Sequence, residues 1–137
     1  MDYKEIAEKF FADDLYATKL SGIVIDEVEP GYAKCRMEIT DNHKNANGVA
    51  MGGAVFTLAD FTCSVAANCT ALESPKQNVV SLSANINFLS PGKGPVLYCE
   101  AKSVKSGRAT SLYEARITDS DGRLVAFASM TGFNINK

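Results

Sequence analysis

Hydrophobic spacing along the chain changes from helical to strand-like after the first 21 residues. Within residues 2–13, Ile6 and Phe10 recur near helical spacing among acidic and basic side chains, which predicts a short amphipathic helix. The next segment is rich in β-branched residues, and residues 32–39 alternate between polar and apolar positions. Because successive side chains of a strand point to opposite faces, we expect two strands here, joined by a turn at Pro30-Gly31.

A long hydrophobic segment follows a polar loop at residues 41–48. From Gly52 to about Leu72, apolar side chains occupy every face of a predicted helix, and such a helix belongs in the middle of a fold. After a loop at residues 73–78, turns rich in Gly, Pro, Ser and Asp separate four further strand-like runs. These runs are residues 79–89, 96–103, 109–118 and 123–135. The order predicts an α+β fold in which an antiparallel sheet wraps around a long central helix.

Length and charge narrow the class of protein. A chain of 137 residues is expected to form one domain over residues 1–137, with little room for a deep cleft inside one subunit. We therefore expect a roomy active site to lie at a subunit interface. Against 16 Asp and Glu there are 14 Lys and Arg and no long basic run, so nucleic acid is not an expected partner.

Cysteine and histidine usage and the N-terminus indicate compartment and cofactors. The four cysteines have no CxxC spacing, and the one histidine cannot complete a usual zinc set with them, so we expect no metal. No apolar run approaches the ~20 residues of a membrane span, and the N-terminus carries acidic residues where a signal peptide carries positive charge. These features predict a cytoplasmic protein with reduced thiols and no membrane association.

Polar side chains form a stripe on the otherwise apolar helix. At about 100° per residue, Thr57, Asp60, Ser64 and Asn68 fall on one face. A buried carboxylate is costly unless it is hydrogen-bonded, neutralised or open to a cavity. Asp60 therefore either caps a neighbouring loop or pairs with a cation across an interface, or it serves chemistry.

The start of the same helix favours the chemical interpretation. Residues 45–48 and the run Met51-Gly52-Gly53 place backbone amides and the positive end of the helix dipole where negative charge can develop. An amide that binds an oxygen anion and a carboxylate farther along the helix together suffice for acyl transfer to water.

Three runs of the sequence carry a family resemblance. NANGVAMGGAVFTLAD resembles the signature of the hotdog-fold thioesterases of the PaaI-like acyl-CoA thioesterase group, in which an Asn, a Gly, a His-Gly-Gly and an Asp recur with this spacing. VVSLSANINFLSPGKG and SGRATSLYEARITDSDGRLVAFASMTGF resemble later segments of that family in order. The match covers roughly residues 22–133, and it implies a hotdog fold, an antiparallel sheet wrapped around a long central helix.

The resemblance implies a role for each of five site residues. Asp60 is the expected base that activates water, or the nucleophile that attacks the thioester carbonyl, and the Gly52 amide polarises that carbonyl. Asn45 matches an asparagine that holds the water or orients the carboxylate. Ser81 matches a hydroxyl that in relatives reaches the site from the neighbouring subunit, and Ser64 matches a hydroxyl used in some relatives.

The resemblance also implies how the substrate is held. Acyl-CoA is expected along the interface of a homodimer or a homotetramer built as a dimer of dimers, and no cofactor is expected. Lys93 and Arg108 are candidates for the CoA phosphates, although each also fits a solvated surface charge. Gly53 and Asn47 are further expected substrate contacts.

One departure from the family pattern keeps an alternative function open. Met51 stands where relatives commonly have His, and a thioether is a weak acceptor that cannot replace its hydrogen bonds. The leading hypothesis is an acyl-CoA thioesterase that hydrolyses aliphatic or aryl acyl-CoA to free acid and CoA. The alternatives are a catalytically weak acyl-CoA-binding protein and a dehydratase or hydratase. The latter needs a paired histidine and acid, and His43 is expected to be a solvated loop side chain more readily than a general base.

Overall fold

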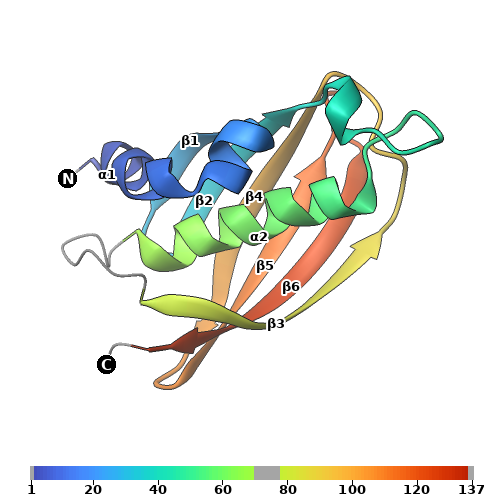
Figure 1. Cartoon of the computed structure of the whole chain (residues 1–137). Helices are drawn as coiled ribbons and strands as arrows, with labels where there is room; N and C mark the ends of the chain where they lie inside the picture. The colour runs from blue at the N-terminus through green and yellow to red at the C-terminus, as the bar shows by residue number, and fades with distance from the viewer. Residues whose placement is uncertain (1, 70–77, 136–137) are drawn as a thin grey trace.

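The computed structural model describes residues 2–69 and 78–135, and within them one antiparallel sheet wraps around a helix (Figure 1). The sheet has six strands in the order β1-β2-β4-β5-β6-β3. The helices are α1 (Tyr3–Phe10), η1 (Phe11–Asp13), η2 (Tyr16–Leu20), η3 (Asp41–His43) and α2 (Gly52–Asn68). The strands are β1 (Ile23–Glu29), β2 (Tyr32–Glu38), β3 (Val79–Phe88), β4 (Val96–Ser106), β5 (Thr110–Thr118) and β6 (Leu124–Asn134). The predicted α+β layout is confirmed.

The boundaries differ from the prediction mainly in the N-terminal segment. The helix expected over residues 2–13 is α1 followed by the tighter turn η1, and the π-helical turn η2 was not predicted. Just before η2, the main-chain oxygen of Asp14 accepts hydrogen bonds from the amide and the hydroxyl of Thr18. The Ser21 amide closes η2 by donating to the Tyr16 oxygen at 2.9 Å. The predicted continuation of the long helix to Leu72 and most of the loop at 73–78 lie outside the described residues.

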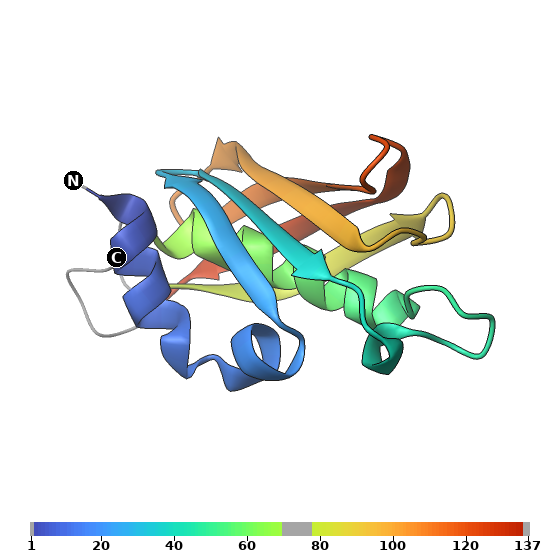
Figure 2. The ribbon, with the colours of Figure 1, turned by 90° about the horizontal axis from the view of Figure 1, so that it is seen from above.

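The long helix α2 lies in the concave face of the sheet, between the strands and the N-terminal elements (Figure 2). Along β2, β4 and β5, buried residues alternate with more exposed ones, so that small and apolar side chains point inward. The sheet-facing side chains of α2 pack against these inward residues and are buried. The core includes Val55, Leu58 and Val65 of α2 and Met37, Cys35, Leu97, Cys99 and Ile117 of the sheet. Within the described residues, no helix is long and apolar enough to cross a membrane.

Strand β3 lies at one end of the sheet. It pairs with β6 on one side, and no other described strand pairs with its outer edge. Apolar side chains on and after it are exposed to solvent, with Leu82 61%, Phe88 54% and Leu89 55% exposed. An unpaired edge with exposed apolar side chains favours pairing with another chain. At the other end of the sheet, α1 packs against β1.

Candidate active site

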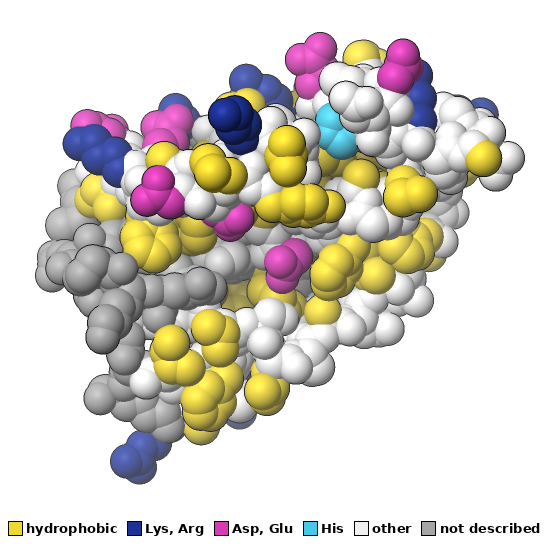
Figure 3. Space-filling view, viewed as in Figure 1, with side chains coloured by type: hydrophobic (Ala, Val, Ile, Leu, Met, Phe, Trp, Pro, Cys, Tyr) yellow, Lys and Arg dark blue, Asp and Glu magenta, His cyan; other side chains and the backbone are white. Residues whose placement is uncertain are grey.

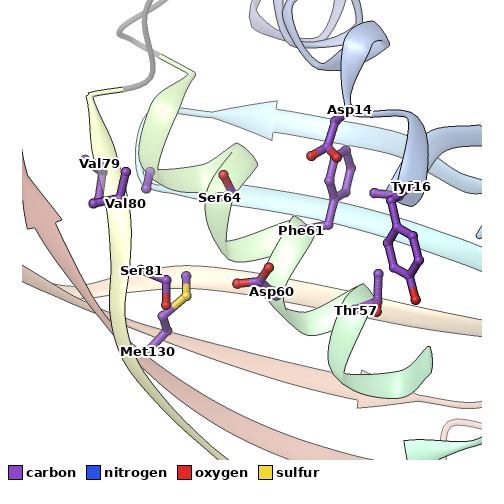
Figure 4. A pocket seen from close by; sticks show the side chains of 12 residues that line it. Asp14, Tyr16, Thr57, Asp60, Phe61, Ser64, Val79, Val80, Ser81 and Met130 are labelled. Atoms are coloured by element: carbon purple, nitrogen blue, oxygen red, sulfur yellow. The ribbon is translucent and has the colours of Figure 1, made fainter. Parts of the chain in front are cut away.

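A cavity of about 270 Å³ lies between the N-terminal segment, α2 and β3. Figure 3 shows this face hollowed, with acidic side chains beside hydrophobic ones. The cavity is lined by Asp14, Tyr16, Ala17, Thr57, Asp60, Phe61, Ser64, Ala67, Val79, Val80, Ser81 and Met130. In Figure 4, α2 supplies Asp60 and Ser64, β3 supplies Ser81, and the N-terminal segment supplies Asp14 and Tyr16.

Asp60 is the carboxylate at the centre of this cavity, and its surroundings disfavour its charged form. Burial raises its pKa above the ordinary value, and the negative charge of Asp14 raises it further. No Lys, Arg or His is among the described residues that line the cavity. Within the described residues of one chain, no cation at this cavity neutralises Asp60. A half-buried, unneutralised carboxylate open to a cavity is suited to accept a proton.

Three of the four residues in the polar stripe on α2 line the cavity, and the fourth, at the C-terminal end of the helix, does not. Thr57, Asp60 and Ser64 line the cavity as their shared face predicts, although the Thr57 hydroxyl donates to the Gly53 oxygen at 2.8 Å. Asn68, the fourth member, is fully buried and lies outside the cavity lining. Ser81 lines the same cavity as Asp60 of its own chain, so no neighbouring subunit is needed to bring these two together.

The first turn of α2 presents backbone amides to a second cavity. The amides of Ala54 and Val55 donate to the Met51 oxygen, at 2.9 and 3.1 Å. Within the described residues, the amides of Gly52 and Gly53 have no backbone acceptor. This is the usual condition of the first residues of a helix, and it leaves them able to bind an anion.

The second cavity, of about 390 Å³, holds Gly52 and Asn45 but not Asp60. Gly52 is packed closely there, because a Cβ atom would lie 3.3 Å from the Phe88 ring. Gly52 and Asp60 are eight residues apart on one helix, which at about 1.5 Å per residue separates them by about 12 Å along its axis. The expected amide and carboxylate therefore lie in different cavities of one chain.

The loop before α2 uses Asn45 to hold its own shape. The side-chain oxygen of Asn45 accepts hydrogen bonds from the amides of Asn47 and Val49, at 2.9 and 3.3 Å. Asn45 reaches the second cavity, whereas Asn47 and Gly53 line neither cavity. Asn45 thus shapes the loop that leads to the helix start.

The two candidate cations for CoA stand at opposite ends of β4. Lys93 precedes the strand and Arg108 follows it, and both are exposed. The strand has 11 residues, about 36 Å at about 3.3 Å per residue. The structure therefore does not bring these two side chains together. Lys93 follows Gly92, which lines the second cavity.

The expectation that His43 is solvated is wrong. His43 is 9% exposed, and its Nδ1 accepts from the Thr40 amide at 3.0 Å, while Nε2 lies 2.7 Å from the Ser21 oxygen. Both ring nitrogens are engaged, and His43 lines neither cavity, so it is not placed as a general base. The side chains of Thr40 and His43 close a capping box at η3, with His43 at the position that Glu or Gln usually takes.

Asp14 and Tyr16 line the cavity although the sequence did not indicate them. The ring of Phe11 meets that of Phe61 edge to face at 5.4 Å, which fixes the N-terminal segment against α2 next to Asp60. The Asp14 amide donates to the Phe11 oxygen at 2.9 Å. The position of Asp14 and Tyr16 beside Asp60 depends on tertiary packing, which no local sequence pattern indicates.

Comparisons with known proteins identify the family of the chain. Residues 47–126 match the thioesterase superfamily. Human acyl-coenzyme A thioesterase 13 is 31% identical over 109 residues, which are 78% of this chain and 76% of that protein. The acyl-coenzyme A thioesterase PaaI of Escherichia coli is 30% identical over 121 residues, 88% of this chain and 82% of that protein.

Solved structures share the whole fold. The structure of the E. coli PaaI protein has a TM-score of 0.81 at 26% identity and covers 97% of this chain and 96% of that one. A hypothetical thioesterase protein of Streptococcus pneumoniae, solved with coenzyme A, has a TM-score of 0.79 at 26% identity and covers 93% of this chain and 98% of that one. An antiparallel sheet wrapped around a central helix is the architecture of the hotdog fold. The chain belongs to the thioesterase superfamily, and within it to the PaaI-like hotdog thioesterases.

Proposed function

We propose that the protein is an acyl-CoA thioesterase with Asp60 as its catalytic carboxylate. Relatives named acyl-coenzyme A thioesterase, and a structural neighbour solved with coenzyme A, support this substrate class. The observation that carries the assignment is the Asp60 side chain, a half-buried carboxylate without a neutralising cation among the described cavity residues. Its raised pKa makes the ionised form a stronger base, which suits proton abstraction.

Hydrolysis needs one water molecule and no other reactant. Water adds to the thioester carbonyl carbon while the Asp60 carboxylate takes one of its protons. The carbon–sulfur bond then breaks, and CoA leaves as a thiolate that takes up a proton. In the direct alternative, Asp60 attacks the carbon itself, the carbon–sulfur bond breaks with loss of the CoA thiolate, which takes up a proton, and water hydrolyses the resulting anhydride to the free acid and the Asp60 carboxylate. The hydroxyls of Ser64 and Ser81, in the same cavity, are proposed to hold the water or the carboxylate.

We propose that the polarising amide comes from a second copy of the chain. Gly52 and Asp60 lie too far apart on α2 to meet one thioester within a chain. A twofold dimer formed by antiparallel pairing of two β3 edges turns the α2 helices antiparallel, which brings the Gly52 amide of one copy toward Asp60 of the other. The exposed edge of β3 supports this dimer, of which a tetramer would be a pair. Asn45 lies beside Gly52 in its cavity and is proposed to act there.

The remaining binding assignments concern CoA itself. Lys93 adjoins the cavity that holds Gly52 and is the better placed cation for a CoA phosphate, while Arg108, Gly53 and Asn47 are secondary candidates. Burial raises the pKa of the Cys35 and Cys63 thiols to about 12. Such inert, buried thiols fit the reducing cytoplasm, which we propose as the compartment.

Release of CoA thiol from a panel of aliphatic and aryl acyl-CoAs tests the proposal. We expect turnover by the wild-type protein and a loss of about 10²–10⁴-fold in Asp60→Asn. Met51 is 53% exposed at the helix start and supports one alternative, a weakly catalytic acyl-CoA-binding protein. Binding without thiol release by the wild-type protein would favour that alternative, and equal turnover by Asp60→Asn would remove Asp60 from its role.

A further inference from the structure

Asn68, the last residue of α2, joins this helix to the edge strand β3. Its side chain is fully buried. The Nδ2 group donates to the main-chain oxygens of Ser64 at 3.0 Å and Val79 at 3.1 Å. The Oδ1 atom accepts from the amides of Asn78 at 3.0 Å and Val79 at 2.8 Å. One side-chain amide thus bonds both backbone groups of Val79, as a neighbouring strand would.

Val79 is held from a second direction by β6. Val79 pairs with Asn134 in the register of the two strands, and a Cβ atom at the nearby Gly132 would lie 2.6 Å from the Val79 side chain. The start of β3 is therefore fixed by close packing on β6 and by the Asn68 amide on α2. Since β3 is an edge strand with one strand neighbour among the described residues, the Asn68 bonds supply its attachment to the helix.

The residues fixed in this way form one wall of the Asp60 cavity. Val79, Val80 and Ser81 line it from β3, while Asp60 and Ser64 line it from α2 (Figure 4). The backbone oxygen of Ser64 is itself a partner of Asn68. The same amide therefore binds the element that carries the carboxylate and the element that carries the opposing hydroxyl.

We propose that Asn68 is a positioning residue, whose side-chain amide sets the distance between the β3 wall carrying Ser81 and the Asp60 carboxylate on α2. The inference rests on the proposed thioesterase function. Asn68 touches no substrate in this assignment and acts through Val79 and Ser64. Displacements of about 1 Å at reacting groups can lower rates by about 100-fold, so a loosened wall is expected to lower kcat.

Hydrogen exchange in the wild-type protein tests the attachment directly. We expect the amides of Asn78 and Val79 to be protected, and Asn68→Ala to speed their exchange at least about tenfold while the β4 and β5 amides keep their protection. Unprotected amides at both positions in the wild-type protein would overturn the proposal without any variant having to fold.

Kinetics of two variants and a matched control separate positioning from general stability. Asn68→Ala removes these four bonds and a fifth, from Nδ2 to the Ser64 hydroxyl at 3.4 Å. Asn68→Asp keeps the side-chain volume, while ionisation removes both donors. Val65→Ala is the control, because Val65 is fully buried on the same helix but does not line the Asp60 cavity. At temperatures well below each Tm, we expect kcat to fall about tenfold in both Asn68 variants and to stay within about twofold in Val65→Ala.

The outcomes distinguish this inference from the proposed function. Equal losses of kcat in Asn68→Ala and Val65→Ala at equal Tm, or an unchanged kcat in both Asn68 variants, would overturn the positioning role. If the wild-type protein releases no thiol from any acyl-CoA, the proposed function fails instead. Asn68 is then judged by hydrogen exchange and by binding of a thioether analogue of acyl-CoA, which Asn68→Ala must weaken.

Discussion

At the scale of single residues, the catalytic role proposed for Asp60 requires a charged form that lowers the stability of the fold. Burial and the charge of Asp14 raise its pKa above the ordinary value of 3.8, so the folded chain holds this proton more tightly than the unfolded chain. As the pH rises from the ordinary pKa through the raised one, ionisation of Asp60 costs stability, and above the raised pKa the whole cost is present. A group kept for catalysis despite such a cost is common at active sites.

Asp60→Asn is therefore expected to raise the melting temperature at neutral pH. The amide has nearly the same shape and does not ionise, so the variant avoids the desolvation of a charge. The gain should shrink as the pH falls through the raised pKa and vanish below the ordinary one, where both side chains are neutral. Scanning calorimetry across this pH range checks the prediction, and a lower Tm for the variant at neutral pH would contradict it.

Asp14→Asn is expected to shift the acid limb of the kcat/KM profile to lower pH. The negative charge of Asp14 disfavours ionised Asp60, so its removal lowers the pKa of Asp60. Because Asp14 is exposed, water screens the interaction, and we expect a small shift to lower pH that added salt reduces in the wild-type protein. Asp13→Asn is the control, since Asp13 is exposed nearby but lines neither cavity. Equal profiles for Asp14→Asn and the wild-type protein would show that Asp14 does not act on Asp60.

At the scale of elements, hydrophobic periodicity predicted α2 and all six strands because that signal is local. The inward residues of β2, β4 and β5 alternate with polar ones, and α2 is apolar on nearly every face. The N-terminal wall of the cavity could not be predicted, since it depends on the contact between Phe11 and Phe61.

In the candidate site, too, local spacing could be predicted from the sequence and tertiary contacts could not. The stripe of Thr57, Asp60, Ser64 and Asn68 was readable at helical spacing, and the first three line one cavity while Asn68 does not. The separation of Gly52 from Asp60 also follows from the helical rise. That this separation places them in two different cavities could be learned only from the structure. The structural role of His43 was missed because a loop histidine was weighed by its polarity and not by its spacing from Thr40.

His43→Ala is expected to destabilise the fold while leaving catalysis nearly intact. The variant leaves the Thr40 amide and the Ser21 oxygen without their partners, which costs about 1–3 kcal/mol. Urea unfolding measures this loss, and thiol release should stay within about threefold of the wild-type rate, since a general base would cost about 100-fold or more. Asn42→Ala, an exposed change in the same turn, is the control and should alter neither. A loss of activity with unchanged stability would restore His43 as a candidate base.

At the scale of the whole molecule, Asp60 and Gly52 line different cavities of one chain, and the proposed site therefore draws on two chains. This is testable because the amide of Gly52 can be removed without breaking the helix. Gly52 is the first residue of α2, where proline fits, and Met51 before it is extended at φ −65° and ψ 143°. Gly52→Pro deletes the N–H group, and the exposed Phe88 ring beside it can shift.

Mixing two inactive variants should restore activity if the site is shared. Chains with Asp60→Asn keep the Gly52 amide, and chains with Gly52→Pro keep the Asp60 carboxylate. In a heterodimer purified with two different tags, one of two interface sites then holds both groups, so we expect about half of the wild-type activity. A heterodimer of wild-type and Asp60→Asn chains sets that value independently. If the amide and the carboxylate worked within one chain, the mixed variants would be as inactive as their parents. A monomer found by light scattering at micromolar concentration would also exclude the shared site.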